Sequence, residues 1–375
     1  MDIRTLVQSK AVLICAVLVV EFGLFETGLR LKGGTEAAPE FQRLFTPDSR
    51  LGYRLKAGAS ARLTTSDFDT PITINRAGVR DREVGPKAPG ERRIVVLGDS
   101  LVMAVQVPLD VTFTAQLERL LNTGAGRPSG YRVINAGVQG YGPVEEYLFH
   151  RDVTSTLHPD VVLLALYVGN DAVEAGNAAY RLRQDQDGRV ADPISPLDRF
   201  TQWRRRLIRR SIMLQIIRLR VTTRLDRFGW RPEIDPPLRT YLPDAPPEIA
   251  RGLDATRDAV SRLAALTASQ GARLAVVLLP ARFQVDDGDY DRLKEIVARS
   301  GKVLERDRAT DRFKAALAGL GVPVLDVLPA LRAAARQSDV FMQSTAHFTP
   351  YGHEVMAGIL RAFLRDAGLA GVEDR

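Results

Sequence analysis

The stretch RIVVLGDSLVMAVQV at residues 93–107 decides the fold of this chain. It begins with a short apolar run at 94–97, ended by glycine, which is typical of a buried strand in a parallel sheet. Apolar residues then recur at helical spacing over 101–121, so the Gly-Asp-Ser at 98–100 is predicted to form a strand-to-helix turn. Open α/β folds bind ligands beyond the carboxyl ends of their strands, which makes Ser100 a candidate functional residue. In the alternative, this turn only caps the helix.

Two later strands are predicted to end at the same edge of the sheet. Residues 131–138 lead into Gly140, and glycine lets a backbone come close to a ligand. Residues 161–167 lead into Asn170. Right-handed crossovers place these strand ends on one edge of a parallel sheet. Further strands and helices alternate after them and complete a three-layer α/β/α domain: strands over 273–279 and 322–327, and helices over 248–270, 307–320 and 351–367.

The composition is that of a globular protein and offers little material for a metal centre. Of 375 residues, 45% are hydrophobic and 26% charged, which is typical of a folded domain. The single cysteine, Cys15, excludes an intramolecular disulfide and a cysteine-based zinc cluster. With four histidines in the whole chain, we expect neither a metal site nor a bound cofactor.

Four short motifs resemble the sequence blocks of the SGNH, or GDSL, hydrolases. They are Gly-Asp-Ser at 98–100, Asn-Ala-Gly-Val-Gln-Gly at 135–140, Gly-Asn-Asp at 169–171 and His-Phe-Thr-Pro-Tyr-Gly-His at 347–353. They occur in the order of the family, and each of the first three follows a predicted strand. The resemblance implies the flavodoxin-like three-layer sheet of that family, over about residues 90–180 and 270–365.

The resemblance also assigns roles to four residues. Ser100 would be the nucleophile, and a serine hydroxyl needs an adjacent base to act as one. His347 would be that base and would pass the proton to the leaving alcohol. The N–H groups of Ser100 and Gly140 and the side-chain amide of Asn170 would form the oxyanion hole. His353 is expected to pack in the helix that begins near it.

The chain departs from the family pattern at two places. Family members carry an aspartate two or three residues before the histidine, where this chain has Thr345 and Ser344. Two alternatives remain open: Asp339 supplies the carboxylate, or Ser100 and His347 act as a dyad whose ring is held by a backbone carbonyl. After the serine, a family glycine pattern is replaced by Ala104 and Gln106, which removes no catalytic group.

The N-terminal segment is predicted to anchor the protein in a membrane. Residues 11–29 are mostly apolar and as a helix would reach about 28 Å, close to the hydrocarbon thickness of a bilayer. Glu21 and Glu26 make the span imperfect. A cleaved signal peptide and a buried helix are the alternatives. The anchored arrangement places the catalytic domain outside the cytoplasm, on the periplasmic side.

A basic insertion interrupts the predicted domain. Residues 202–231 hold ten arginines and one aspartate in a chain whose net charge is +7, so the positive charge lies in this one segment. A helical cap over the site, an interfacial helix on anionic lipid and a surface for an acidic polysaccharide are the three interpretations. Nucleic acid is not expected, because no known motif accompanies the charge.

These observations predict a domain order and two functional classes. Residues 1–32 would form the anchor, 33–90 a linker with a small β appendage, and 91–370 the SGNH domain, with an insertion at about 172–250 whose part at 184–193 reads as a loop. The chain would be a serine esterase or O-acyltransferase acting on ester groups, acetyl above all, of a surface glycan. The alternative is a catalytically weak binding module for a polysaccharide or a membrane partner. A nucleotide-binding flavodoxin-like protein is disfavoured because no phosphate loop is present.

Overall fold

The computed structural model describes residues 37–123, 130–187 and 234–369. By its contacts the chain divides into two compact units, one made of residues 40–191 and 234–375 and the other of 1–39 and 192–233. The predicted anchor at 11–29 and the basic segment at 202–231 lie outside the described residues. No helix within the described ranges is long and apolar enough to cross a membrane.

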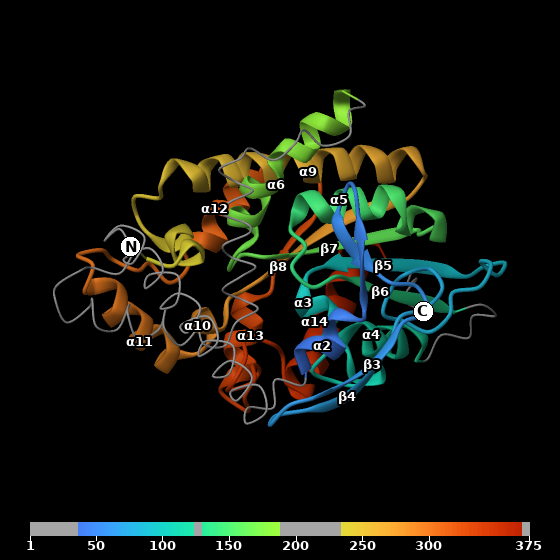
Figure 1. The fold of residues 1–375 in the computed structure, drawn as a ribbon, viewed down its shortest axis with the longest axis horizontal. Helices are drawn as coiled ribbons and strands as arrows, with labels where there is room; N and C mark the ends of the chain where they lie inside the picture. Colours follow the sequence, from blue (N-terminus) through green and yellow to red (C-terminus); the bar gives the residue numbers. More distant parts are fainter. Residues whose placement is uncertain (1–36, 124–129, 188–233, 370–375) are drawn as a thin grey trace, which may run out of the picture. The chain divides into compact units, whose positions relative to one another are not determined.

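A five-stranded parallel sheet forms the centre of the larger unit, as predicted (Figure 1). Its strand order is β6-β5-β7-β8-β9, and every neighbouring pair is parallel. The strands are β5 (Arg92–Gly98), β6 (Tyr131–Gly137), β7 (Val161–Tyr167), β8 (Arg273–Leu279) and β9 (Val324–Asp326). Because β5 lies between β6 and β7, the carboxyl ends of the first three strands are neighbours at one edge of the sheet.

Helices cover both faces of the sheet, because alternate side chains of a strand point to opposite faces. Val95 and Leu97 of β5 belong to the same apolar core as α5 (Pro143–Asp152), α6 (Asp171–Asp187), α9 (Pro247–Ser269) and α12 (Arg308–Leu317). Ile94 and Val96 belong to a second core with α4 (Phe113–Asn122), α13 (Leu328–Ala335) and α14 (Pro350–Asp366). This is the three-layer α/β/α arrangement, and α9, α12 and α14 lie where the sequence predicts helices.

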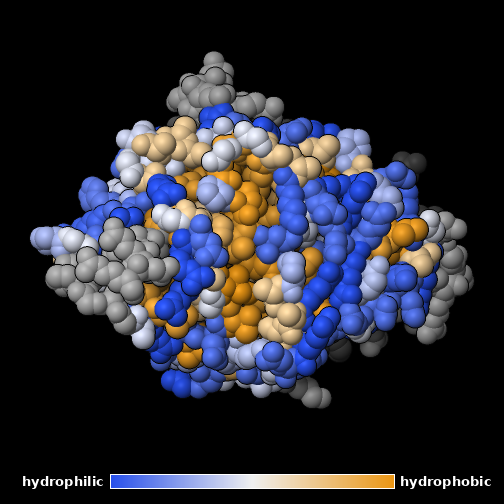
Figure 2. All heavy atoms as spheres, turned by 180° about the vertical axis from the view of Figure 1, so that it is seen from behind, coloured by the Kyte–Doolittle hydropathy of each residue, from blue (hydrophilic) through white to orange (hydrophobic). Residues whose placement is uncertain are grey.

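Short helices occupy the connections between these elements. They are α2 (Ala37–Gln42), α3 (Ser100–Met103), η1 (Leu109–Val111), η2 (Thr154–Leu157), η3 (Pro236–Tyr241), α10 (Arg282–Val285) and α11 (Asp287–Ala298). One detail of the prediction is wrong: residues 184–187 are not a loop but the last turn of α6, because the insertion begins by extending that helix. Figure 2 shows apolar residues gathered in a band through the middle of the rear face, with polar residues on both sides.

Two hairpins precede the sheet and pack against its core. β1 (Phe45–Asp48) pairs with β2 (Gly52–Leu55), and β3 (Ser60–Thr64) pairs with β4 (Asp69–Thr73), both antiparallel. Their inward side chains, Leu55, Leu63 and Ile72, are buried in the main core. Both hairpins lie within residues 33–90, where the sequence predicts a small β appendage.

The segment after the hairpins is tied to the turn that follows Ser100. Arg80 is buried, with 1% of its surface exposed. Its guanidinium donates to the carbonyl oxygens of Met103 and Val107, each at 2.6 Å. A buried charge needs such partners to offset the loss of water. Arg80 therefore holds the backbone at the C-terminal end of α3 and just beyond it.

Candidate active site

Ser100 is the first residue of α3, directly after β5. Asp99 caps this helix: its carboxylate accepts a hydrogen bond from Leu101 N at 2.8 Å. Ser100 itself is half-buried, and its N–H donates to no other described residue. The helix ends after one turn at Ala104, whose φ of 52° lies in the left-handed region that favours glycine. The turn thus has the geometry that the sequence predicts, with an alanine where a glycine would be less strained.

Gly140 lies on the turn that follows β6, exposed and with a φ of 72°. The Tyr53 hydroxyl donates to the carbonyl oxygen of Gln139 at 2.6 Å. A Cβ at Gly140 would lie 2.9 Å from that hydroxyl, so only glycine fits there without a shift. The C=O of Gln139 and the N–H of Gly140 belong to one planar peptide group and point in opposite directions. Tyr53, from β2, therefore fixes the orientation of the Gly140 N–H, which the sequence assigns to the oxyanion hole.

Asn170 precedes α6 and is held by a residue of that helix. Its Nδ2 donates to Glu174 Oε1 at 2.8 Å, while its Oδ1 is buried and accepts from no described residue. An amide nitrogen carries two hydrogens. One hydrogen binds Glu174, and the other is available for a developing negative charge.

His347 lies on a tight loop between two paired phenylalanines. Phe341 and Phe348 form an antiparallel bridge, and their rings stack at 4.9 Å. Met342 N donates to the His347 carbonyl at 2.8 Å. Both ring nitrogens of His347 are buried and without a hydrogen-bond partner among the described residues. Burial lowers the pKa of His347 to about 4, so the ring is neutral at pH 7, the form that a general base requires.

Neither predicted support for the His347 ring is formed in this structure. The Asp339 carboxylate is exposed and accepts a hydrogen bond from Gln343 Nε2 at 3.1 Å. No backbone carbonyl of a described residue accepts from the ring either. The hydrogen bond between Ser100 and His347 is also absent, and catalytic hydrogen bonds often tighten only when substrate binds.

His353 packs in a helix, as expected. It lies in α14 with 1% of its surface exposed, and its Nδ1 accepts a hydrogen bond from Phe113 N at 3.2 Å. Burial lowers its pKa to about 3. This histidine is therefore part of the core on that face of the sheet.

A group of buried carboxyl groups lies behind the strand ends and was not predicted. Burial raises the pKa of Asp99 to about 7, and burial together with Asp99 and Glu145 raises that of Glu174 to about 8. Burial and their carboxyl neighbours also raise the pKa of Glu146 and Asp171. Burial thus favours the neutral form of these carboxyl groups.

The sequence of α5 carries no clear signal for this group. Five of its ten residues are charged or histidine, and only the folded chain shows that Glu146 is buried beside Tyr147 and Leu148. Tyr53 carries no signal either, because the Gln139 carbonyl to which it donates is 86 residues away in sequence.

No metal site is evident in the part of the chain that the structure describes. Within those ranges no group of three His, Cys, Asp or Glu side chains is placed to hold a metal ion. The residues that follow the three strands, Gly140, Ser100 and Asn170, offer a hydroxyl, a side-chain amide and backbone N–H groups.

Comparison with known proteins finds a family model that matches part of the chain. Residues 243–375 match the family model of the SGNH hydrolase-like domain of the acetyltransferase AlgX. This match confirms the resemblance to SGNH hydrolases and supports an esterase or acetyltransferase. The matched residues include His347 and begin after Ser100, Gly140 and Asn170.

Several solved structures are similar to this chain at low identity. An acetyl xylan esterase, AlAXEase, shares 12% identity, covers 72% of this chain and 99% of its own, and has a TM-score of 0.40. A catalytic mutant of the acetylxylan esterase Axe2 from Geobacillus stearothermophilus shares 14% identity over 77% and 100%, with a TM-score of 0.41. A lipase/acylhydrolase from Enterococcus faecalis shares 14% identity over 74% and 96%, with a TM-score of 0.40. A search of curated proteins gave no match.

Proposed function

We propose that this chain, which carries an SGNH hydrolase-like domain, transfers an acyl group from an ester to water or to a second hydroxyl through Ser100. The observation that carries the proposal is the order β6-β5-β7. Because these neighbouring strands are parallel, the residues that follow them, Gly140, Ser100 and Asn170, leave the sheet at one edge. An acyl-transfer site needs a nucleophile between oxyanion donors, and this edge supplies both kinds of group.

The reaction follows from the groups available. Ser100 Oγ attacks the acyl carbon while His347 takes its proton, and the carbonyl oxygen becomes an oxyanion facing the N–H groups of Ser100 and Gly140 and the amide of Asn170. His347 then gives the proton to the alcohol oxygen as the C–O bond breaks. Water or a second hydroxyl, deprotonated by His347, then attacks the acyl carbon. The bond between this carbon and Ser100 Oγ breaks, and His347 returns the proton to Oγ.

A fluorophosphonate probe that labels activated serines tests this proposal. The full chain is expected to be labelled, and Ser100→Ala is expected to abolish labelling. Ser60→Ala, on the exposed strand β3, is the matched control and is expected to label like the wild type. Labelling that persists in Ser100→Ala would contradict the proposal.

A binding module is the second candidate. The absence of a described partner for the His347 ring favours it, because a histidine whose ring is not oriented is a poor base. Absence of labelling in the wild type, with hydrolysis of p-nitrophenyl acetate no faster than in Ser100→Ala, would support this candidate.

The location in the cell is part of the proposal. Residues 11–29 would hold the protein in a membrane, with the larger unit outside the cytoplasm and an acetylated surface glycan as its substrate. The apolar composition of that segment supports the anchor. Full-length protein released into the soluble fraction by carbonate would contradict it, and a shortened N-terminus by intact mass would indicate a cleaved signal peptide.

A further inference from the structure

A groove of about 550 Å³ lies beside the loop that carries His347. Its wall includes Phe341, which is bridged to Phe348, the residue after His347. Arg282, at the start of α10, joins the groove to the same loop by donating to the carbonyl oxygens of Met342 at 2.9 Å and Gln343 at 2.6 Å. The groove therefore adjoins the candidate site next to the loop of His347, the proposed base.

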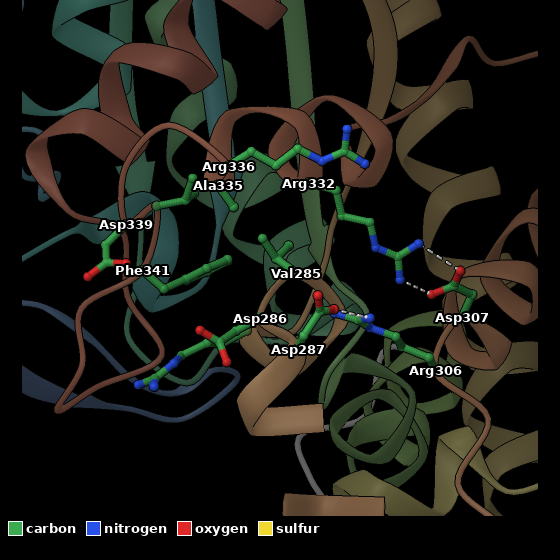
Figure 3. A pocket seen from close by; sticks show the side chains of 12 residues that line it. Val285, Asp286, Asp287, Arg306, Asp307, Arg332, Ala335, Arg336, Asp339 and Phe341 are labelled. Atoms are coloured by element: carbon green, nitrogen blue, oxygen red, sulfur yellow. Dashed lines mark hydrogen bonds and ion pairs between the residues drawn. The ribbon is translucent and has the colours of Figure 1, made fainter. Parts of the chain in front are cut away.

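Charges of both signs line the groove in balance, with four arginines and four aspartates among the lining residues. Three of the four arginines are paired: Arg306 with Asp287 at 2.5 Å, Arg332 with Asp307 through two hydrogen bonds of 3.0 and 2.5 Å, and Arg282 with Asp289 at 2.6 Å. Figure 3 shows Arg306 and Arg332 on one side of the hollow, with Phe341 on the other side and Asp286 below. The arginines would attract a free anion, but the aspartates would repel it. A cation would be attracted by the aspartates and repelled by the arginines.

One donor and one acceptor of the wall remain available to a ligand. The Arg306 guanidinium is used within the wall, because it pairs with Asp287 and lies over the Tyr290 ring at 5.0 Å. The Arg336 side chain is exposed and makes no hydrogen bond or ion pair with any described residue. One oxygen of Asp286 accepts from Asp289 N at 2.7 Å, and its other oxygen accepts from no described residue. A ligand oxygen can therefore accept from Arg336, and a ligand O–H can donate to Asp286.

Hydroxyl groups meet these requirements, because each one both donates and accepts. They can accept from Arg336 and donate to Asp286 without carrying a charge. Val285 and Phe341 add an apolar portion to the wall, against which the C–H face of a sugar ring can lie. The combination fits a neutral polyhydroxylated chain better than a charged one.

The position of the groove beside the loop of His347 indicates which part of the substrate it binds. In acyl transfer the base exchanges its proton with the alcohol oxygen, so the alcohol portion of the ester lies on the side of the base. We propose that the groove binds this alcohol portion, and that it is a neutral oligosaccharide. This inference rests on the proposed function for the reaction, but the binding itself requires no catalysis.

Ligand-observed NMR on the full-length Ser100→Ala protein tests the binding separately from the reaction. The probes are xylohexaose, mannohexaose and maltohexaose, with hexagalacturonate as the anionic comparison. At least one neutral hexasaccharide is expected to bind, and Arg336→Ala is expected to weaken it by about tenfold. Arg361→Ala removes an equally exposed arginine from α14, away from the groove, and is expected to leave binding unchanged.

Three results would overturn the inference: binding of hexagalacturonate alone, binding of none of the probes, or equal effects of the two arginine variants. Circular dichroism of both variants controls for folding, and Arg336→Gln is the alternative if Arg336→Ala is unstable. If this test fails while serine labelling is intact, the inference about the groove is wrong but the proposed enzyme activity stands. Failure of labelling with binding intact would instead support the binding module.

Discussion

The His347 ring is buried, neutral and without a described hydrogen-bond partner. Burial lowers its pKa to about 4, because a protonated imidazole loses more hydration than a neutral one. A base must be unprotonated to accept the proton from Ser100. Activity through His347 should therefore persist to more acid pH than activity through a solvated histidine.

The pH dependence of kcat/KM for p-nitrophenyl acetate tests this directly, because kcat/KM reports the pKa of the free enzyme. We expect the acid limb to be half-maximal near pH 4. A limb near pH 6.5, the ordinary value for histidine, would show that the ring is solvated or paired in the working enzyme.

Thr345 occupies one of the two positions at which the family carries an aspartate, and its Oγ1 is buried without a partner among the described residues. A carboxylate there could accept from the ring and stabilise the imidazolium formed in the transition state. We expect Thr345→Asp to raise kcat for p-nitrophenyl acetate by about tenfold or more. Thr345→Asn, of similar size but uncharged, is the control, and an equal effect of both substitutions would contradict the electrostatic account.

At the scale of elements, strand β2 gives the hairpin that precedes the sheet a role in the site. Tyr53 of β2 donates to Gln139, and Tyr141 donates in turn to the Tyr53 carbonyl at 2.6 Å. Burial raises the pKa of the Tyr53 hydroxyl, so it keeps its proton and stays a donor. The hairpin thus holds the peptide group between Gln139 and Gly140, which carries the Gly140 N–H.

Tyr53→Phe removes only that hydroxyl. Loss of one positioning hydrogen bond is worth about 1 kcal/mol, so kcat for p-nitrophenyl acetate should fall about fivefold to tenfold with little change in KM. Tyr290→Phe is the matched control, because its hydroxyl also donates to a backbone carbonyl, that of Leu304 at 3.1 Å. Equal losses in the two variants would contradict a positioning role for Tyr53.

The sheet was predictable from local patterns, whereas the supports of the site were not. The runs at β5, β6, β7 and β8 are short and apolar, and each ends at a turn, so their number and direction follow from sequence. Ser100, Gly140 and Asn170 could be assigned because strand ends converge in such a sheet. Tyr53 meets the Gln139 carbonyl only in the folded chain. Glu174 lies four residues after Asn170, but its burial depends on how α6 packs.

At the scale of the whole larger unit, the buried carboxyl groups make stability depend on pH. The pKa of Asp99 is raised to about 7 and that of Glu174 to about 8, whereas both groups ionise near pH 4 in an unfolded chain. Between these values the folded state holds protons that the unfolded state has lost. Their contribution is therefore complete at acid pH and is lost as the pH rises toward 8.

The buried histidines act in the opposite sense and in a lower range. The pKa of His347 is lowered to about 4 and that of His353 to about 3, so they lower stability as the pH falls below about 6.5, where the unfolded chain takes up protons. Between about pH 6.5 and 8 the carboxyl effect alone remains. We expect the urea midpoint of the full chain to fall across that window.

The free energy of unfolding also falls across that window, and Glu174→Gln should reduce its fall by about 1 kcal/mol. The reason is that glutamine does not titrate and can still accept from Asn170. Glu354→Gln, on the exposed side of α14, is the control and should fall as the wild type does. A wild-type midpoint that stays constant or rises over this range would contradict the assignment of neutral carboxyl groups.

The central claim is that Ser100 carries the acyl group, and mass spectrometry of the trapped acyl-enzyme tests it most directly. The full chain is mixed with p-nitrophenyl acetate, quenched in acid within the first turnover and digested. The account predicts an acetyl group on the peptide that contains Ser100, absent in Ser100→Ala and reduced in His347→Ala. Acetylation that is found only on other residues, or that is equal in the wild type and Ser100→Ala, would contradict it.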